Sequence, residues 1–399
     1  MLNNNIIEEK RTLIKYYSIF FVVVFPILEA YSIFGISITF ILSLLIIFLN
    51  FLYKKKNEIN IKKIYVPLLL YVLFTCVLSM NGFLVLNNYK NLLNAVIMQL
   101  INVTAFLIAW ENIEFDQMIA FADVIAYVCC LFVCVQFFML ITGKEVPLGK
   151  LPFLEVHTTW IPEIWGFRFN SFFSEPSYFA IFLLPVFAVH FLNFEWKKTV
   201  FFGIFILLSS SSLGIITMIT IIITRTIAGN IRVKSKIKII LGIMCIVLAF
   251  YFVLSNSTVL NNILYRTFDK TISIFNNQNG VNDIRLIGHL KYFSLLPIKE
   301  KMFGVGISQL QNYFLEHGYN LSNYSNSFVL TIINSGIIGL IVLMIFLIYL
   351  LKISLKNKSL IFFIILFFTL LVDSILIGYR FYWLCMYIFL FKPKEENKI

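Results

Sequence analysis

Apolar runs as long as a membrane is thick make up most of this chain. Of its 399 residues, 60% are hydrophobic and only 13% are charged, whereas a soluble domain is about half apolar and a quarter charged. A helix needs about 20 apolar residues to cross the hydrocarbon core. Because no soluble core can enclose this much apolar sequence, we predict a single all-α integral membrane domain that covers residues 1–399.

Most of the runs have the length of one crossing, and two are longer. The single runs are 13–32, 34–53, 64–80, 91–110, 118–141, 177–194, 238–254 and 326–350. The longer stretches, 199–229 and 359–391, each begin and end beside basic residues, so each is expected to cross an even number of times. We predict bends at 209–212 and 378–380, and about twelve transmembrane helices in all.

The basic residues predict the orientation of the chain. They collect at 10–15, 54–63, 197–198, 232–238, 352–358 and 392–398. Positive charge marks the cytoplasmic side, so we expect both termini in the cytoplasm and the first run to be retained as a span. The formal net charge of +12 then reflects topology. We expect the lipid bilayer as a partner and no nucleic acid, because no basic run is interleaved with aromatic residues in a soluble segment.

Two predicted outer loops are long, at residues 142–176 and 255–325. Loops of this length are uncommon in compact structures unless they have a function. The other predicted outer turns are short. The working surface of the protein is therefore expected on the extracytoplasmic side.

The first long loop ends with an arginine and a glutamate held just above the next span. Proline fits the first turn of a helix, so Glu175-Pro176 is expected to open this span, with Ser174 as its cap. The exposed N–H groups of such a terminus favour an anion. The alternative is that Arg168 and Glu175 pair with each other or anchor the chain at the interface.

The second long loop carries a further arginine. Arg285 precedes a predicted short amphipathic helix at 287–290, and Gly304-Val305-Gly306 predicts a tight turn. The guanidinium fork suits phosphate oxygens, so Arg168 and Arg285 are able to clamp a diphosphate without a metal. The aspartates are scattered along the chain and do not pair, so we expect no metal ion and no cofactor. The lysines of this loop are expected to contact lipid headgroups.

Two acidic residues, Asp123 and Asp373, lie inside apolar runs. Charge at this depth is costly and suggests a function, although an interhelical hydrogen bond is the structural alternative. Arg380 is a candidate partner for Asp373, and His190 is expected to be structural.

Three segments together resemble the bacterial O-antigen polymerase and O-antigen ligase superfamily. They are Arg168 with Ser174-Glu175-Pro176-Ser177-Tyr178-Phe179-Ala180, Arg285 with Phe303-Gly304-Val305-Gly306, and Asn326-Ser327 with Gly336-Ile337-Ile338-Gly339-Leu340. Their order and spacing follow the family pattern from the first long loop to residue 340, and the flanking spans match only in hydropathy. The resemblance implies a fold of about twelve helices, similar to membrane glycosyltransferases of the GT-C type.

The resemblance also implies roles for particular residues. Arg168 and Arg285 would engage an undecaprenyl-diphosphate-linked oligosaccharide donor in the bacterial cytoplasmic membrane. Glu175 or His317 would be the catalytic base. Tyr324 and Asn326 would orient the sugar. A separate protein that regulates chain length is a further expected partner.

One departure from the family pattern separates the possible activities. Ligases carry a histidine, then Asn, Ser or Gln, then nine residues, then Gly-x-x-Gly; counting back from Gly336 places Ser325 at the histidine position. A serine cannot act as an imidazole base, which favours a repeat-unit polymerase. A ligase and a flippase or transporter for lipid-linked oligosaccharide are the alternatives. Transporters tend to show internal repeats, and the sequence shows none.

Overall fold

The computed structural model describes residues 2–53, 62–86, 89–151, 153–156, 167–228, 289–321, 325–376 and 378–392. The chain forms two compact units, one of Met1–Ala122 with Gly280–Pro393 and one of Asp123–Asn279 with Lys394–Ile399. Each unit is described by itself below. The single membrane domain expected from the sequence stays a prediction.

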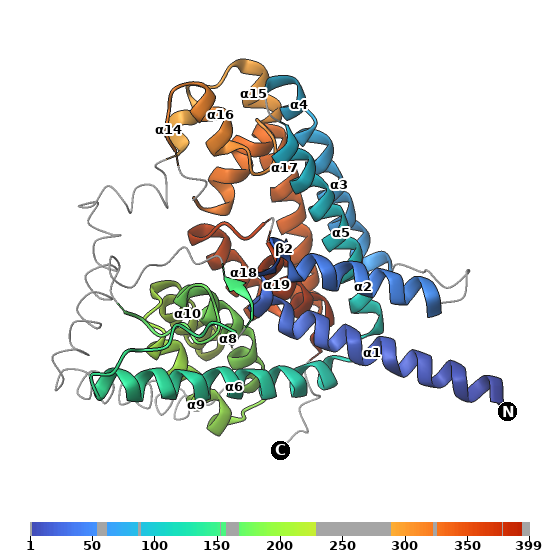
Figure 1. Ribbon diagram of the computed structural model, residues 1–399, viewed down its shortest axis with the longest axis vertical. Coiled ribbons are helices and arrows are strands. Elements are labelled where there is room, and N and C mark those ends of the chain that lie inside the picture. The colour runs from blue at the N-terminus through green and yellow to red at the C-terminus, as the bar shows by residue number, and fades with distance from the viewer. Residues whose placement is uncertain are drawn as a thin grey trace. The chain divides into compact units, whose positions relative to one another are not determined.

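The first unit is a bundle of apolar helices with a few short elements (Figure 1). Its long helices are α1 (Leu2–Leu28), α2 (Ile38–Tyr53), α3 (Val66–Ser79), α5 (Lys90–Asn112), α17 (Ser327–Lys356), α18 (Leu360–Val372) and α19 (Tyr379–Leu390). Its short elements are β1 (Tyr31–Ile33), β2 (Ile36–Ser37), η1 (Lys63–Tyr65), α4 (Gly82–Val85), α14 (Leu290–Phe293), α15 (Ile298–Phe303) and α16 (Leu310–Glu316). Strands β1 and β2 form an antiparallel hairpin between α1 and α2.

Helix α19 lies at the centre of the first unit. Every residue from Tyr379 to Phe389 is buried, as expected for a helix that is hydrophobic on all sides. It packs against α1, α5, α17 and α18. Aromatic rings make many of these contacts, with ring centroids 4.1 Å apart for Phe25 and Tyr379 and 4.8 Å apart for Phe106 and Tyr382.

The second unit contains α8 (Pro176–Leu192), α9 (Trp196–Leu208) and α10 (Ser212–Ala228), together with the short strand β3 (Glu155–Val156). Helix α6 (Phe115–Ile141) begins in the first unit and continues into the second. Helices α8, α9 and α10 pack against one another in pairs.

The described helices fall on the predicted apolar runs, but the hairpin β1–β2 occupies residues 31–37, where the predicted spans 13–32 and 34–53 meet. The count of about twelve crossings stays a prediction. The chain breaks between α9 and α10 at the predicted serine-rich bend, and it breaks between α18 and α19 at 373–378, slightly before the predicted bend. The predicted span 238–254 lies outside the described residues. Helices in four parts of the described chain are long and apolar enough to cross a membrane: Lys63–Val85, Lys90–Asn112, Phe115–Ile141 and Ser327–Lys356.

The described part of the second long loop is folded against the first unit. Helices α14, α15 and α16 all contact α17, and Figure 1 shows them grouped at one end of it. The first half of the amphipathic helix predicted at 287–290 lies outside the described residues, and α14 starts at Leu290. The loop is therefore a structural part of the bundle rather than a free connection.

A glycine-containing turn from this loop interlocks with a break in α17. Gly336 lies inside α17 with a φ of +68°, and Gly304 and Gly306 have φ values of +81° and +103°. A break in a helix leaves backbone carbonyls without their usual partners. The Val305 N–H donates to Ile333 O at 3.0 Å, and the Gly306 N–H donates to Asn334 O at 2.9 Å. The tight turn predicted from the sequence thus supplies the missing donors.

The same contact requires glycine on both sides. A Cβ atom at Gly304 would collide with the backbone of Asn334, and one at Gly336 would collide with the backbone at Met302. Replacing either by alanine should therefore lower the free energy of unfolding through both left-handed backbone strain and overlap. Gly318 isolates the strain alone, because its φ is +84° and a Cβ atom there would meet nothing within 4 Å.

We expect Gly318→Ala to cost about 1 kcal/mol, and Gly304→Ala and Gly336→Ala to cost about 1–3 kcal/mol more. The measurement is thermal or denaturant unfolding of the purified full-length protein in detergent. Equal losses in all three variants would contradict the interlock.

Candidate functional site

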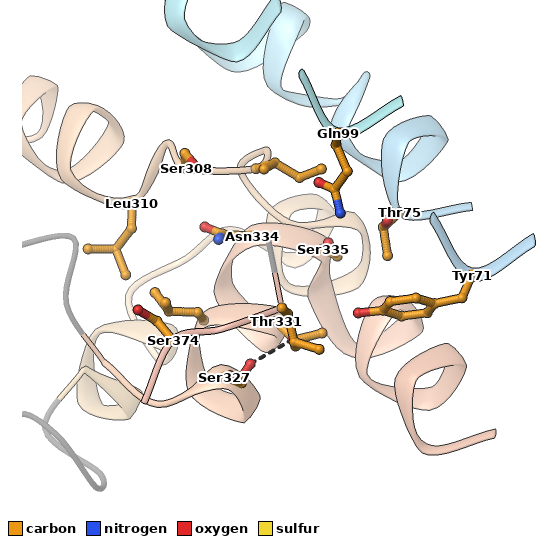
Figure 2. A pocket seen from close by; sticks show the side chains of 13 residues that line it. Tyr71, Thr75, Gln99, Ser308, Leu310, Ser327, Thr331, Asn334, Ser335 and Ser374 are labelled. Atoms are coloured by element: carbon orange, nitrogen blue, oxygen red, sulfur yellow. Dashed lines mark hydrogen bonds between the residues drawn. The ribbon is translucent and has the colours of Figure 1, made fainter. Parts of the chain in front are cut away.

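A polar cavity lies within the first unit, beside the break in α17. Its volume is about 190 Å³, and its walls come from α3, α5, α17, residues 307–310 and residues 374–376. The polar side chains that line it include Thr75, Gln99, Ser308, Thr331, Asn334 and Ser374 (Figure 2). Such a concentration of hydroxyl and amide groups is unusual inside an apolar bundle, where polar side chains generally have a function.

Two buried amides in this wall have a side-chain oxygen that accepts no hydrogen bond from the described residues. Gln99 on α5 and Asn334 on α17 are 3% and 4% exposed, and both line the cavity (Figure 2). Gln99 Oε1 and Asn334 Oδ1 have no hydrogen-bond donor among the described residues. Leaving a buried polar atom unsatisfied costs about 1–3 kcal/mol. The cavity is thus suited to a ligand that donates hydrogen bonds.

The cavity wall is electrically neutral. Among the described residues that line it, none is acidic, basic or histidine. A buried phosphate or carboxylate needs a cationic partner or several donors. The cavity therefore favours an uncharged, hydroxyl-rich group over the diphosphate of a lipid carrier.

A buried ion-pair cluster borders the cavity. Arg380 Nε lies 3.2 Å from Glu29 Oε2, and Arg380 Nη1 lies 3.7 Å from Asp373 Oδ2. The predicted pairing of Arg380 with Asp373 is confirmed, and Glu29 is a nearer partner that the sequence analysis missed. Asp373 O accepts hydrogen bonds from the backbone N–H and the hydroxyl of Ser327, which lines the cavity. The cluster thus fixes one edge of the cavity.

Two of the site residues predicted from the sequence lie near this region. Asn326 caps α17, because its Oδ1 accepts a hydrogen bond of 2.9 Å from the Val329 N–H, and it precedes the cavity residue Ser327. His317 is exposed at the end of α16, with its ring stacked on Tyr313 and its Nδ1 2.8 Å from Tyr313 O. Neither side chain lines the cavity.

The remaining predicted residues fall elsewhere. Tyr324 and Arg285 lie outside the described residues. Arg168 and Glu175 belong to the second unit, where both are half-buried. Pro176 begins α8 as predicted, but the residue in the capping position is Glu175 rather than Ser174. The Ser177 hydroxyl donates to Glu175 Oε2 at 3.1 Å.

The segment that holds Arg168 and Glu175 is fixed by α6. Gln136 Nε2 donates to Asn170 Oδ1 at 3.0 Å, and the Ser171 N–H donates to Gln136 Oε1 at 3.1 Å. Asn170 Nδ2 in turn donates to Phe173 O at 2.6 Å. These bonds hold the path of the chain between the arginine and the start of α8, which gives both residues a defined backbone position.

Gln99 and Asn334 were not among the residues predicted from the sequence. Each is a single amide in an otherwise apolar span, which is a signal for a site but a common one. Their convergence depends on the packing of α5 against the rest of the bundle and on the break at Gly336. Spacing along the chain does not contain this information.

A second charged cluster lies in the second unit. His190 Nε2 is 2.7 Å from Asp123 Oδ1, and His190 Nδ1 is 2.9 Å from Glu195 Oε2. Lys198 Nζ completes the cluster at 2.6 Å from Asp123 Oδ2. Both ring nitrogens of His190 thus lie against carboxylate oxygens. The cluster joins α6, α8 and α9, which supports the structural interpretation of Asp123 and His190.

Replacing His190 should show how much this cluster contributes to the free energy of unfolding. His190→Leu leaves the buried Asp123 with Lys198 alone, and we expect a loss of about 3 kcal/mol in the free energy of unfolding. Glu195→Gln, at a partly exposed position that keeps an acceptor, should cost about 1 kcal/mol or less. Unfolding of the detergent-purified variants measures both. A smaller loss for His190→Leu than for Glu195→Gln would exclude the proposed network.

Within the described residues, no group of three or more His, Cys, Asp or Glu side chains has a geometry suited to a metal ion. No protein-family model matches the chain, and no curated protein matches it significantly.

Proposed function

We propose that this protein is a polysaccharide repeat-unit polymerase, a membrane glycosyltransferase that uses an undecaprenyl-diphosphate-linked donor and a lipid-linked acceptor. One observation carries the proposal. Two of the three segments that resemble the family interlock, because the backbone N–H groups of Val305 and Gly306 donate to carbonyls of α17. Ser327, Thr331 and Asn334 of the later segment line the neutral polar cavity, and Ile307 follows the earlier segment directly in its wall. Sequence motifs separated by about twenty residues thus meet beside a space that suits sugar hydroxyls.

The proposed reaction needs three operations. The acceptor hydroxyl attacks the anomeric carbon of the donor glycan, the bond from that carbon to the diphosphate oxygen breaks, and the hydroxyl proton passes to a base. Arg168 and Arg285 stabilise the departing diphosphate, in place of a metal ion. The products are a glycan longer by the transferred chain, still on the acceptor's lipid, and free undecaprenyl diphosphate.

His317 and Glu175 are the two candidates for the base. The Tyr313 carbonyl only accepts hydrogen bonds, so the short contact to His317 Nδ1 favours a proton on that nitrogen. In a neutral imidazole this leaves Nε2 with a lone pair, as a base requires. Glu175 occupies the N-cap position of α8 and supplies the other candidate, a carboxylate. Tyr324 and Asn326 are proposed to orient the sugar.

The proposed topology has about twelve crossings in a bacterial cytoplasmic membrane, with both termini in the cytoplasm. Reporter fusions placed after Lys56 and Lys358 should then be active as cytoplasmic reporters. Fusions placed after Gly143 and Gly318 should be active only as extracytoplasmic reporters. Fluorescent-protein and alkaline-phosphatase fusions at each position provide paired measurements. If the fusion after Gly318 is active as a cytoplasmic reporter, the predicted extracytoplasmic location of the loop at 255–325 is wrong.

One observation favours a flippase or transporter instead. Helix α17 is broken at Gly336 beside the polar cavity, and discontinuous helices around a polar site are common in transporters. A transporter moves the lipid-linked saccharide without forming a bond. The two functions therefore differ in product rather than in substrate.

The test is to incubate the purified protein with lipid-linked repeat units alone and to separate the products on a gel. We expect a ladder of longer lipid-linked glycans, reduced about 100-fold in Arg168→Ala and Arg285→Ala. Arg225→Ala is the matched control, because this arginine lies in α10 outside the motif segments and contacts Leu192 O. Movement of intact substrate across a vesicle bilayer, with no ladder, would establish the transporter.

A further inference from the structure

We propose that the cavity between α3, α5 and α17 binds one uncharged sugar ring, with the Gln99 and Asn334 amides as its specificity contacts. The identification of the ring as part of the transferred glycan rests on the proposed function. The binding itself does not.

The size of the cavity fits one ring. One water molecule needs about 10–15 Å³ of such a space, so a cavity of about 190 Å³ has room for a group of many heavy atoms, such as one sugar ring. The rest of an oligosaccharide would extend out of the cavity.

The two amides specify the kind of group that binds. Gln99 Oε1 and Asn334 Oδ1 both need donors, and each amide also carries an NH₂ group that needs an acceptor. A sugar hydroxyl is both a donor and an acceptor. Neighbouring hydroxyls on one edge of the ring are therefore able to donate to the amide oxygen and to accept from the amide NH₂ group. Thr75, Thr331 and Ser374 add hydroxyl groups around the same space.

The wall also has an apolar part, formed by Ile307, Leu310, Leu330 and Leu376. A pyranose ring has C–H faces as well as hydroxyl edges, and it matches such a mixed wall. Water alone satisfies the amides but gains nothing from the leucine and isoleucine surface. The mixed lining therefore favours a sugar over a cluster of ordered water.

The neutral wall excludes acidic sugars. A uronic acid or a phosphate-bearing sugar would place a negative charge among hydroxyls, amides and aliphatic groups, with no cation in the described lining to offset its desolvation. The ring that binds is thus a neutral hexose, deoxyhexose or N-acetylhexosamine.

Leucine substitutions give a test that separates binding from folding. Removing a buried polar atom that has no partner is close to neutral for stability, or stabilising. Gln99→Leu and Asn334→Leu should therefore fold with an unfolding midpoint at or above that of the wild type, while losing the ligand. A purely structural role for the amides predicts a lower midpoint instead.

The binding probe is a panel of methyl glycosides of neutral sugars, with methyl glucuronoside as the charged comparison. Saturation-transfer NMR on the full-length protein in detergent detects weak binding. We expect at least one neutral glycoside to bind and its affinity to fall about tenfold or more in each leucine variant. Methyl glucuronoside should not bind. Asn50→Leu is the control, since Asn50 is an equally buried amide with an unpaired Oδ1 among the described residues, on α2 away from the cavity.

Two results would overturn the proposal: no binding of any neutral glycoside to the wild type, or unchanged binding in both cavity variants. The polymerisation assay keeps this separate from the proposed function. If neutral sugar binding is lost in Gln99→Leu and Asn334→Leu but the ladder is unchanged, the bound ring is not part of the transferred glycan and the polymerase function stands. If neutral sugar binding depends on both amides but no ladder forms, the proposed polymerase function is wrong and the proposed sugar site stands.

Discussion

Two backbone hydrogen bonds, from Val305 and Gly306 to carbonyls of α17, hold together the part of the molecule where the cavity lies. A helix break at Gly336 would otherwise leave Ile333 and Asn334 with unpaired carbonyls. In an apolar bundle each such group costs several kcal/mol. The turn that supplies the donors must therefore stay docked, and the Asn81 side chain supports it by donating to Gly304 O at 2.7 Å. The backbone of Asn334 is fixed by this contact, which leaves its side chain free to face the cavity.

The need of every buried polar group for a partner also explains the contacts of the buried charges in both units. An ionised carboxylate inside an apolar bundle must have a cation or hydrogen-bond donors close to it. Asp373 meets Arg380, and Asp123 meets His190 and Lys198. Each aspartate connects elements that are distant in the sequence, so each pair also defines how its helices pack. In the first unit this places Ser327, and with it the start of α17, against the segment between α18 and α19.

Hydropathy and turn chemistry predicted the positions of the helices well. The serine-rich bend between α9 and α10 and the proline at the start of α8 are where the sequence placed them, because both signals are local. The hairpin β1–β2, the short helix α4 and the packing of residues 289–321 on α17 were not predicted. The hairpin and α4 are short local elements inside or beside apolar runs, where a hydropathy profile reads a continuous span. The packing of residues 289–321 on α17 depends on contacts between separate segments, and a hydropathy profile contains no information on those.

The site was predicted only in part, for a related reason. Charged and motif residues such as Arg168 and Glu175 stand out in a sequence with few charges. Gln99 and Asn334 do not, because a single amide in an apolar span has many structural explanations. The Asp373–Arg380 pair could be inferred from the scarcity of charge, whereas Glu29 lies more than 300 residues away in the sequence.

In the proposed polymerase, the neutral cavity and the arginines would have different tasks for an energetic reason. Charge-assisted hydrogen bonds are about twice as strong as neutral ones, which suits a diphosphate whose charge grows as its bond to the sugar breaks. A growing glycan must instead be held and then released in every cycle. Amide and hydroxyl contacts worth about 0.5–1.5 kcal/mol each position a sugar ring without retaining it. A wall with no charged side chain is therefore the kind of surface that a repeating transfer reaction needs for its sugar.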